Sequence, residues 1–169
     1  QRVIGDWKRK QQLADDQQMF ERHRYFTVQY NAVATVQGAQ RVATVTVTNP
    51  PVNALNERAL DELTVVVEHL SRRDDVVAVV FTGQGTASFV AGADIRQLLE
   101  DIHTLDEARA LPNNAHLAFR KIERMGKPCI AAIQGVALGG GMEFALACHY
   151  RIAEPTARFG QPEIRLRLI

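Results

Sequence analysis

A run of glycines followed by an acid is the segment with the clearest chemical potential. Gly139, Gly140 and Gly141 separate an apolar segment from a helix-forming one, and Glu143 follows them. Without Cβ atoms the turn lets another molecule approach the backbone, and the free amides of a helix N-terminus favour negative charge. The turn could bind a phosphate, a carboxylate or the oxygen of an activated carbonyl. A plain tight turn explains the glycines equally well.

Glu143 and Glu163 are the candidate acid–base residues. A solvated, structural role is the commoner explanation for a glutamate in the first turn of a helix, because the helix dipole stabilises it there. Residues 144–147 are apolar, however, which favours a Glu143 carboxylate that faces a cleft. Glu163 follows the turn 159–162. Two carboxylates beside one cavity can share general acid and base work on a water molecule, but sequence separation alone does not show that they meet.

A second bend occurs at Ala91-Gly92-Ala93-Asp94. Gly92 permits an unusual backbone conformation, and Asp94 is well placed to cap the helix expected after it. Capping is favoured over catalysis for Asp94. The functional suggestion concerns the backbone amide of Ala93, which could pair with that of Gly140.

The hydrophobic pattern predicts the elements that position these residues. Period-two segments at 25–36 and 41–48 favour a hairpin with its turn at Gly38–Gln40, and continuous apolar runs favour buried strands at 76–81 and 129–133. Helices are expected at about 57–70, after Asp94 through Ile95 and Leu99, over about 105–125 with a break at Pro112, and at 142–148.

The order strand, glycine loop, helix occurs twice, about 50 residues apart, which predicts an α/β fold built as a coil of ββα units. Residues 1–25 are polar and read as a helical linker or the end of an upstream region. Residues 26–169 are expected to form the catalytic core.

Composition narrows the class of protein. At 169 residues with 46% hydrophobic and 23% charged, the chain fits one globular domain, and a net charge of +1 gives no argument for a nucleic acid or membrane partner. No apolar run approaches the length needed to span a bilayer. Cys129 and Cys148 lie in apolar segments without metal-ligand spacing. We expect buried free thiols and no metal site, in a reducing, cytoplasmic compartment.

Four segments, in the right order and spacing, resemble motifs of the crotonase (enoyl-CoA hydratase/isomerase) family over residues 27–169. They are Pro51–Asn56, Phe89–Ile95, Ala131–Glu143 and Ala157–Ile164. The resemblance implies a crotonase-like spiral of ββα units. It also implies that the chain stops at Ile169, before the C-terminal trimerisation helices of the family.

By this resemblance, the amides of Ala93 and Gly140 form an oxyanion hole for a thioester oxygen. Glu143 activates the water that attacks C3 of a 2-enoyl-CoA, and Glu163 delivers the proton to C2. The presence of both acids favours hydration over isomerisation. The residues implied to contact the substrate or its CoA are Ala54, Leu55, Ala91, Gly92, Asp94, Ile95, Gly139 and Pro162.

The same resemblance implies a role in fatty acid β-oxidation, with no cofactor beyond the CoA of the substrate. A homotrimer or dimer of trimers is expected for the complete domain, and fusion to another enzyme domain is possible. Isomerase, decarboxylase, lyase and thioesterase activities stay open within the family.

Three readings outside the crotonase activities also stay open. One is a nicotinamide-binding domain, although the spacing from Gly135 to Gly141 does not match G-x-G-x-x-G. Another is a serine hydrolase using Ser88 and His149, although neither lies in a nucleophile-elbow pattern. The last is a non-catalytic module.

Overall fold

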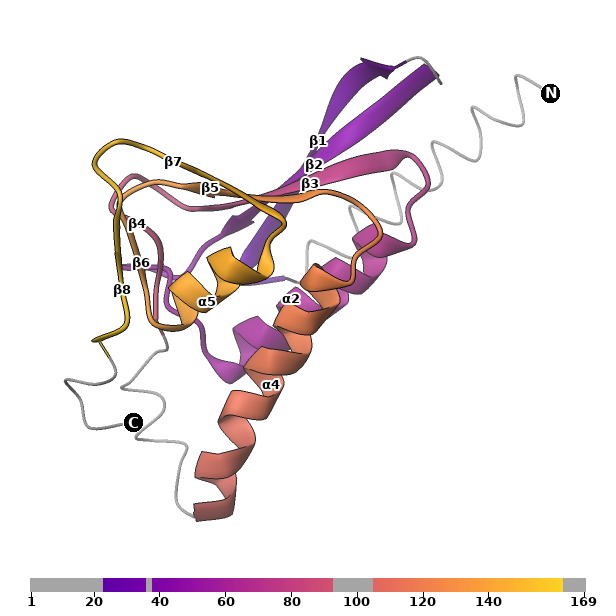
Figure 1. Cartoon of the computed structure of the whole chain (residues 1–169). Helices are drawn as coiled ribbons and strands as arrows, with labels where there is room; N and C mark the ends of the chain where they lie inside the picture. The colour runs from indigo at the N-terminus through magenta and orange to yellow at the C-terminus, as the bar shows by residue number, and fades with distance from the viewer. Residues whose placement is uncertain (1–22, 36–37, 93–104, 163–169) are drawn as a thin grey trace.

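The computed structural model describes residues 23–35, 38–92 and 105–162. Within these ranges the chain forms two sheets and the helices α2, α4 and α5 (Figure 1). The strands are β1 (Phe26–Thr35), β2 (Gly38–Val47), β3 (Val76–Gly83), β4 (Ser88–Ala91), β5 (Cys129–Ile133), β6 (Val136–Leu138), β7 (Tyr150–Ala153) and β8 (Arg158–Gly160). The helices are α2 (Glu57–Ser71), α4 (Leu105–Glu123) and α5 (Gly140–Ala147).

From β3 onward, successive strands alternate between the two sheets. The five-stranded sheet has the order β1-β2-β3-β5-β7, and the three-stranded sheet has the order β4-β6-β8. Apart from the antiparallel β1–β2 hairpin, every pairing is parallel. The chain therefore passes from one sheet to the other and then into a helix, which is the expected coil of ββα units.

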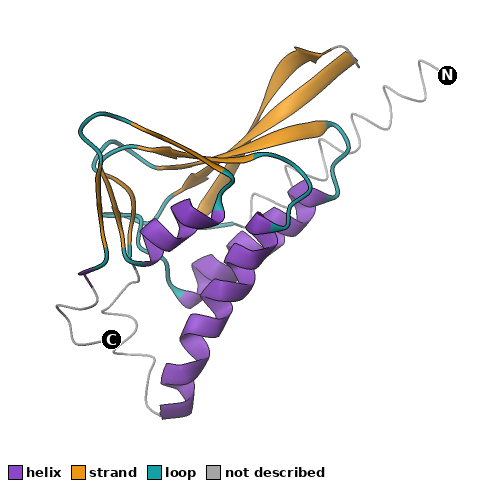
Figure 2. Cartoon of the chain, in the orientation of Figure 1, coloured by secondary structure: helices purple, strands orange, loops and turns teal. Residues whose placement is uncertain are grey.

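The core lies between the helices and one face of the five-stranded sheet, because α2, α4 and α5 lie together on that side (Figure 2). From α2, Leu63, Val66 and Leu70 are buried at three- and four-residue steps. Asn56 caps this helix, since its Oδ1 accepts a hydrogen bond from the Ala59 amide at 2.8 Å. Burial of this apolar stripe outweighs the low helix propensity of its β-branched residues.

Several expected elements are confirmed, and two details are wrong. Gly38–Gln40 belong to β2 rather than to the hairpin turn, because Thr35 already pairs with Gly38. Helix α4 runs through Pro112 without the expected break. A proline removes one backbone donor from a helix, and the hydrogen bonds of the remaining turns keep this helix continuous.

The short strands β4, β6 and β8 lie outside the strands that the sequence predicts, and Phe159 and Gly160 belong to β8 rather than to the expected turn at 159–162. With three or four residues each, these strands are too short to show a hydrophobic period.

Some expectations fall on residues that the structure does not describe. These are the polar helix or linker before residue 23 and the helix after Asp94. The domain boundary expected at residue 25 also stays a prediction. Across the described part of the chain, no helix combines the length and apolar character needed to cross a membrane.

Candidate functional site

The three-stranded sheet brings three bends of the chain to one edge. Ala91 of β4 pairs with Leu138 of β6, and Leu138 pairs with Gly160 of β8. Because these strands are parallel and in register, the segments that follow them leave the sheet at the same side. The carboxyl ends of parallel strands are the usual place for a ligand site in an α/β fold.

The bend between β6 and α5 depends on its glycines for different reasons. Gly139 has φ 51° and ψ −124°, a conformation that other residues rarely adopt. A Cβ added to Gly141 would lie 2.0 Å from the Val90 carbonyl oxygen, so the helix begins pressed against β4. A Cβ added to Gly140 would meet no described residue within 4 Å beyond its own helix and neighbours. Among the described residues, Gly140 therefore faces open space.

The amides of this bend are arranged for an incoming acceptor. Gly139 N–H donates to the Gly160 carbonyl at 2.9 Å, and the Gly139 carbonyl accepts from Met142 and Glu143. The Gly140 amide donates no hydrogen bond to any residue that the structure describes. An unused amide at a helix N-terminus, beside open space, can bind an anion or a polarised carbonyl oxygen.

The bend after β4 is held by the turn at residues 51–56. The Ala91 amide donates to the Val52 carbonyl at 3.1 Å, and the Leu55 amide donates to the Gly92 carbonyl at 2.9 Å. Gly92 has φ 80°, which again favours glycine. The segments expected to contact CoA around Leu55 and Gly92, and the glycine bend at Gly139, therefore converge at one edge of the sheet.

Asparagine side chains fix the turn at residues 51–56. Asn53, 3% exposed, donates from Nδ2 to the carbonyls of Gln84 and Ser88, both at 3.0 Å. Asn49 donates from Nδ2 to the Ala54 carbonyl at 2.7 Å. The motif Pro51–Asn56 predicted this turn but not the role of Asn53 within it. The available signal was an asparagine two residues after a pair of prolines, since asparagine tolerates left-handed backbone and bonds nearby peptide groups.

Glu143 lies in the first turn of α5, and its side chain is exposed. It borders an open groove of about 390 Å³ between α4 and α5. The groove is lined by His116, Phe119, Arg120, Glu123, Glu143, Leu146 and Ala147. No hydrogen bond or ion pair joins the Glu143 carboxylate to the described residues, so the acid is available to a ligand. The catalytic cleft expected to contain Glu143 stays a prediction.

Packing behind the glycine bend fixes the position of α5. Phe144 is fully buried, with ring centroids 5.2 Å from Phe81, 5.5 Å from Phe89 and 5.6 Å from Phe119. At the other end of the helix, the Arg151 guanidinium donates to the carbonyls of Ala145 and Cys148 at 3.1 and 2.7 Å. Cations at a helix C-terminus are favourable. The start of α5 is therefore held by contacts along the helix.

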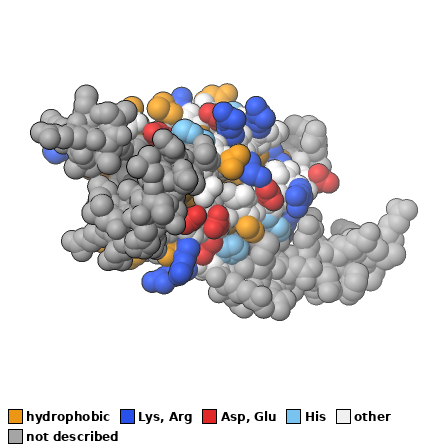
Figure 3. All heavy atoms as spheres, turned by 90° about the horizontal axis from the view of Figure 1, so that it is seen from below, with side chains coloured by type: hydrophobic (Ala, Val, Ile, Leu, Met, Phe, Trp, Pro, Cys, Tyr) orange, Lys and Arg blue, Asp and Glu red, His pale blue; other side chains and the backbone are white. Residues whose placement is uncertain are grey.

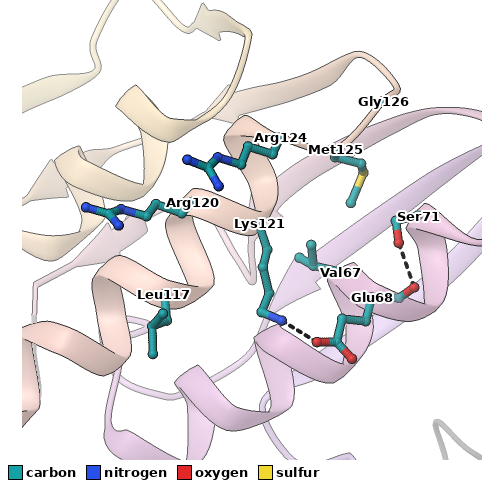
Figure 4. Close-up of a pocket in the computed structure, with 9 residues that line it drawn as sticks. All are labelled: Val67, Glu68, Ser71, Leu117, Arg120, Lys121, Arg124, Met125 and Gly126. Atoms are coloured by element: carbon teal, nitrogen blue, oxygen red, sulfur yellow. Dashed lines mark hydrogen bonds and ion pairs between the residues drawn. The ribbon is translucent and has the colours of Figure 1, made fainter.

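Glu68, a second glutamate close to α4, has a structural role. Glu68 of α2 accepts a hydrogen bond from Lys121 of α4, and Arg120 extends away from this pair (Figure 4). The hydrogen bond and the charge of Lys121 hold the pKa of Glu68 below its ordinary value. Glu143 has no such partner among the described residues.

The surface seen from the helix side carries charges of both signs. Figure 3 shows basic and acidic side chains interspersed on this face rather than gathered by sign. Within the described ranges, no group of three or more His, Cys, Asp or Glu is placed to hold a metal ion.

Several predicted site residues lie outside the described ranges: Ala93, Asp94, Ile95 and Glu163. The pairing of the Ala93 amide with that of Gly140, and the meeting of Glu143 with Glu163, stay predictions. Pro162 is described and follows β8, at the edge where β4 and β6 also end.

Ser88 and His149 are not arranged for hydrolysis. Ser88 is 1% exposed, so its hydroxyl is closed to a substrate. His149 uses Nδ1 to accept from the Cys129 amide at 3.0 Å, and its Nε2 lies 3.2 Å from the Glu123 carbonyl. Both ring nitrogens therefore contact backbone groups, so neither is available to activate a nucleophile.

The cysteines are free and buried, as expected. Burial raises the pKa of the Cys129 thiol to about 12, and burial, with a smaller contribution from Cys129, raises the pKa of the Cys148 thiol to about 12. Both are therefore neutral near pH 7 and poor nucleophiles.

Comparisons with known proteins support the resemblance of the motifs. Residues 37–169 match the enoyl-CoA hydratase/isomerase family model. Over 127 residues the chain is 46% identical to the short-chain-enoyl-CoA hydratase of Clostridium acetobutylicum, covering 75% of this chain and 48% of that protein. It is 45% identical to the crotonyl-CoA hydratase of Syntrophomonas wolfei over 114 residues, covering 68% and 43%.

Solved structures agree with the fold. DspI of Pseudomonas aeruginosa matches with a TM-score of 0.77 and 35% identity, over 87% of this chain and 52% of that one. An enoyl-CoA hydratase of Bacillus anthracis matches with a TM-score of 0.75 and 28% identity, over 85% and 52%. The crotonase-like α/β fold is thus confirmed, and the chain spans about half the length of these relatives. The chain belongs to the enoyl-CoA hydratase/isomerase family.

Proposed function

We propose that the chain carries the thioester-binding and acid–base half of an enzyme that hydrates 2-enoyl-CoA to 3-hydroxyacyl-CoA. The single observation that carries the proposal is the convergence of two glycine bends at the carboxyl edge of the three-stranded sheet, with an unused Gly140 amide beside open space. Relatives named as enoyl-CoA and crotonyl-CoA hydratases support the choice of reaction.

In the proposed reaction, the amides of Gly140 and Ala93 donate to the thioester oxygen. As water adds at C3, negative charge develops on this oxygen, and donors already in place stabilise it without reorganisation. This polarisation draws electrons from the double bond and makes C3 electrophilic. The backbone thus supplies the electrostatic part of catalysis.

The two glutamates supply the proton transfers. Glu143 orients the water and accepts a proton as the oxygen bonds to C3, and Glu163 gives a proton to C2. The net change adds one water across the double bond, and no redox step or added cofactor is required. The exposed Glu143 carboxylate, without a partner among the described residues, suits this role.

The test measures hydration of crotonyl-CoA by the full-length protein that carries this chain, from the loss of the ultraviolet absorbance of the conjugated thioester. Glu143→Gln and Glu163→Gln should each lower kcat about 10²- to 10⁴-fold, the usual range for a general acid or base, and leave thioester binding nearly unchanged. Glu68→Gln is the matched control, since Glu68 has a structural partner on α4, and it should keep full activity.

The results separate this proposal from other activities of the family. A full-length protein without substitutions that does not hydrate crotonyl-CoA would overturn it, as would either glutamine variant with wild-type turnover. Migration of the double bond in a 3-enoyl-CoA, without hydration, would assign an isomerase instead.

The assembly and context of the enzyme are also proposals. A rice peroxisomal fatty acid β-oxidation multifunctional protein is 42% identical over 133 residues, which are 18% of its length. A β-oxidation role and a fused neighbouring domain are therefore plausible extensions of the proposal. Light scattering tests the homotrimer or dimer of trimers expected for a complete domain.

A further inference from the structure

We propose that Asn53 is a positioning residue for the bend after β4, and through that bend for the thioester-binding edge of the site. This inference rests on the proposed function, because it assigns a role within the same site. Asn53 is one of few buried polar residues in the described chain, at 3% exposure. It is also the described non-glycine residue with a positive φ, 55°.

The Asn53 side chain joins both ends of the loop between β3 and β4. Its Nδ2 donates to the carbonyl of Gln84, just after β3, and to the carbonyl of Ser88, the first residue of β4. Its Oδ1 accepts from the Asn49 amide at 3.2 Å. Both side-chain hydrogens are therefore used, and a group with a different donor count cannot reproduce the set.

The backbone on either side of Asn53 connects this anchored side chain to the bend after β4 through two hydrogen bonds. On one side, the Val52 carbonyl accepts from the Ala91 amide; on the other, the Leu55 amide donates to the Gly92 carbonyl. Gly92 directly precedes Ala93, the proposed second donor to the thioester oxygen. The Asn53 side chain thus fixes the turn whose two hydrogen bonds define where β4 ends.

Close packing at Gly83 restricts the position of the Asn53 side-chain amide. A Cβ on Gly83 would lie 2.9 Å from Asn53 Nδ2 and closer still to the carbonyl oxygens of Ser88 and Phe89. The end of β3, the start of β4 and the Asn53 side chain therefore meet without room for adjustment. A small displacement of the turn would be transmitted to β4 rather than absorbed.

Asn53→Asp and Asn53→Gly test the role from two directions. Aspartate keeps the size and tolerance of positive φ but lacks both donors, and it would place a carboxylate against the Gln84 and Ser88 carbonyls. Glycine keeps the backbone conformation and removes the side chain. In crotonyl-CoA hydration each should lower kcat about 10- to 100-fold, as expected for an error of about 1 Å in a donor position, with most of the loss in kcat rather than KM.

A spectroscopic signature separates positioning from loss of stability. A chromophoric aryl-acryloyl-CoA absorbs at longer wavelength when its carbonyl is polarised, so its band should shift less in both Asn53 variants than in the unmodified chain. Asp75→Asn is the matched control, because Asp75 pairs with Arg73 and Arg41 in another part of the molecule. It should lower the melting temperature while keeping the band shift and kcat.

The outcomes distinguish this inference from the proposed function. If the full-length protein without substitutions hydrates crotonyl-CoA and both Asn53 variants keep its kcat and band shift, the positioning role is wrong and the function stands. If the full-length protein without substitutions does not hydrate crotonyl-CoA, the proposed function has failed. Should neither variant fold, hydrogen exchange of the Asn53 side-chain amide in the unmodified chain decides: slow exchange supports the anchor, and exchange as fast as in an exposed asparagine overturns it.

Discussion

The bends after β4 and after β6 reach the same edge of the three-stranded sheet by different means. The β6 bend is held mainly by packing: Gly141 lies against Val90 of β4, and the Phe144 ring of the helix that follows is fully buried. The β4 bend is held by hydrogen bonds, because the Ala91 amide donates to the Val52 carbonyl and the Gly92 carbonyl accepts from the Leu55 amide. The β6 bend therefore depends mainly on close packing, and the β4 bend depends on hydrogen bonds.

Their sensitivities should differ accordingly. Packing around Gly141 and Phe144 in the β6 bend leaves no room for added atoms, so changes at these two positions should cost global stability. Polar anchoring of the β4 bend should allow displacement without unfolding. The following predictions test this difference, from the largest effect to the smallest.

Phe144→Ala should have the largest effect on the packed bend. Its ring contacts three other buried aromatic rings, so truncation leaves a cavity and should cost about 3–5 kcal/mol. Urea unfolding followed by circular dichroism measures the loss. Leu146→Ala on the same helix is the control, because Leu146 is 57% exposed and should change stability by less than about 0.5 kcal/mol. Equal losses in the two variants would contradict the packing account.

Gly141→Ala should be the next most damaging change. The new methyl would lie 2.0 Å from the Val90 carbonyl oxygen, and overpacking of this kind costs about 1–3 kcal/mol. Gly140→Ala, one residue earlier, meets open space and should leave the melting temperature unchanged or raise it. Thermal unfolding of the pair measures the contrast, which a similar loss in both variants would refute.

Gly92→Ala should cost less, although it also lies in a bend. The methyl would be 3.5 Å from the Leu138 carbonyl oxygen, an ordinary contact, so the cost comes from its φ of 80°. A left-handed conformation costs alanine about 1–2 kcal/mol. Gly126→Ala is the control, with nothing within 4 Å. A loss larger than that of Gly141→Ala would invert the comparison between the bends.

The thiols behind the packed bend should have no titration effect at neutral pH, and their effect should appear only in alkaline solution. Burial raises the folded-state pKa of Cys129 and of Cys148 from the ordinary 9.0 to about 12. Their contribution to stability is therefore complete below pH 9 and lost as the pH rises toward 12. Thermal unfolding of the unmodified chain should show this alkaline loss, and Cys129→Ala with Cys148→Ala should reduce it. An identical alkaline profile in the double variant would contradict the assignment to the thiols.

Alkylation of Cys148 tests how firmly the helix after the β6 bend is held, because Cys148 directly follows α5. Modification at neutral pH should be slow in the folded chain and should accelerate in Phe144→Ala, where α5 is less firmly held. Equal rates in the two proteins would show that α5 does not protect this thiol.

The sequence by itself determined the long elements and the types of residue in the site. Apolar runs and helical periods predicted β3, β5 and α2, and the glycine run with Glu143 marked the start of α5. Such patterns are readable because each records the burial of one face over many residues. The hairpin was also readable, although its turn was placed too late in the chain.

Only the tertiary structure decided which bends meet and what holds them there. The strands β4, β6 and β8 are too short to show a period, and their register alone brings Ala91, Leu138 and Gly160 together. Two of the three hydrogen bonds of the Asn53 side chain, those to Gln84 and Ser88, join segments far apart in the chain, so no local pattern predicted them. Contacts between distant segments depend on how the sheets stack, which local propensity does not encode.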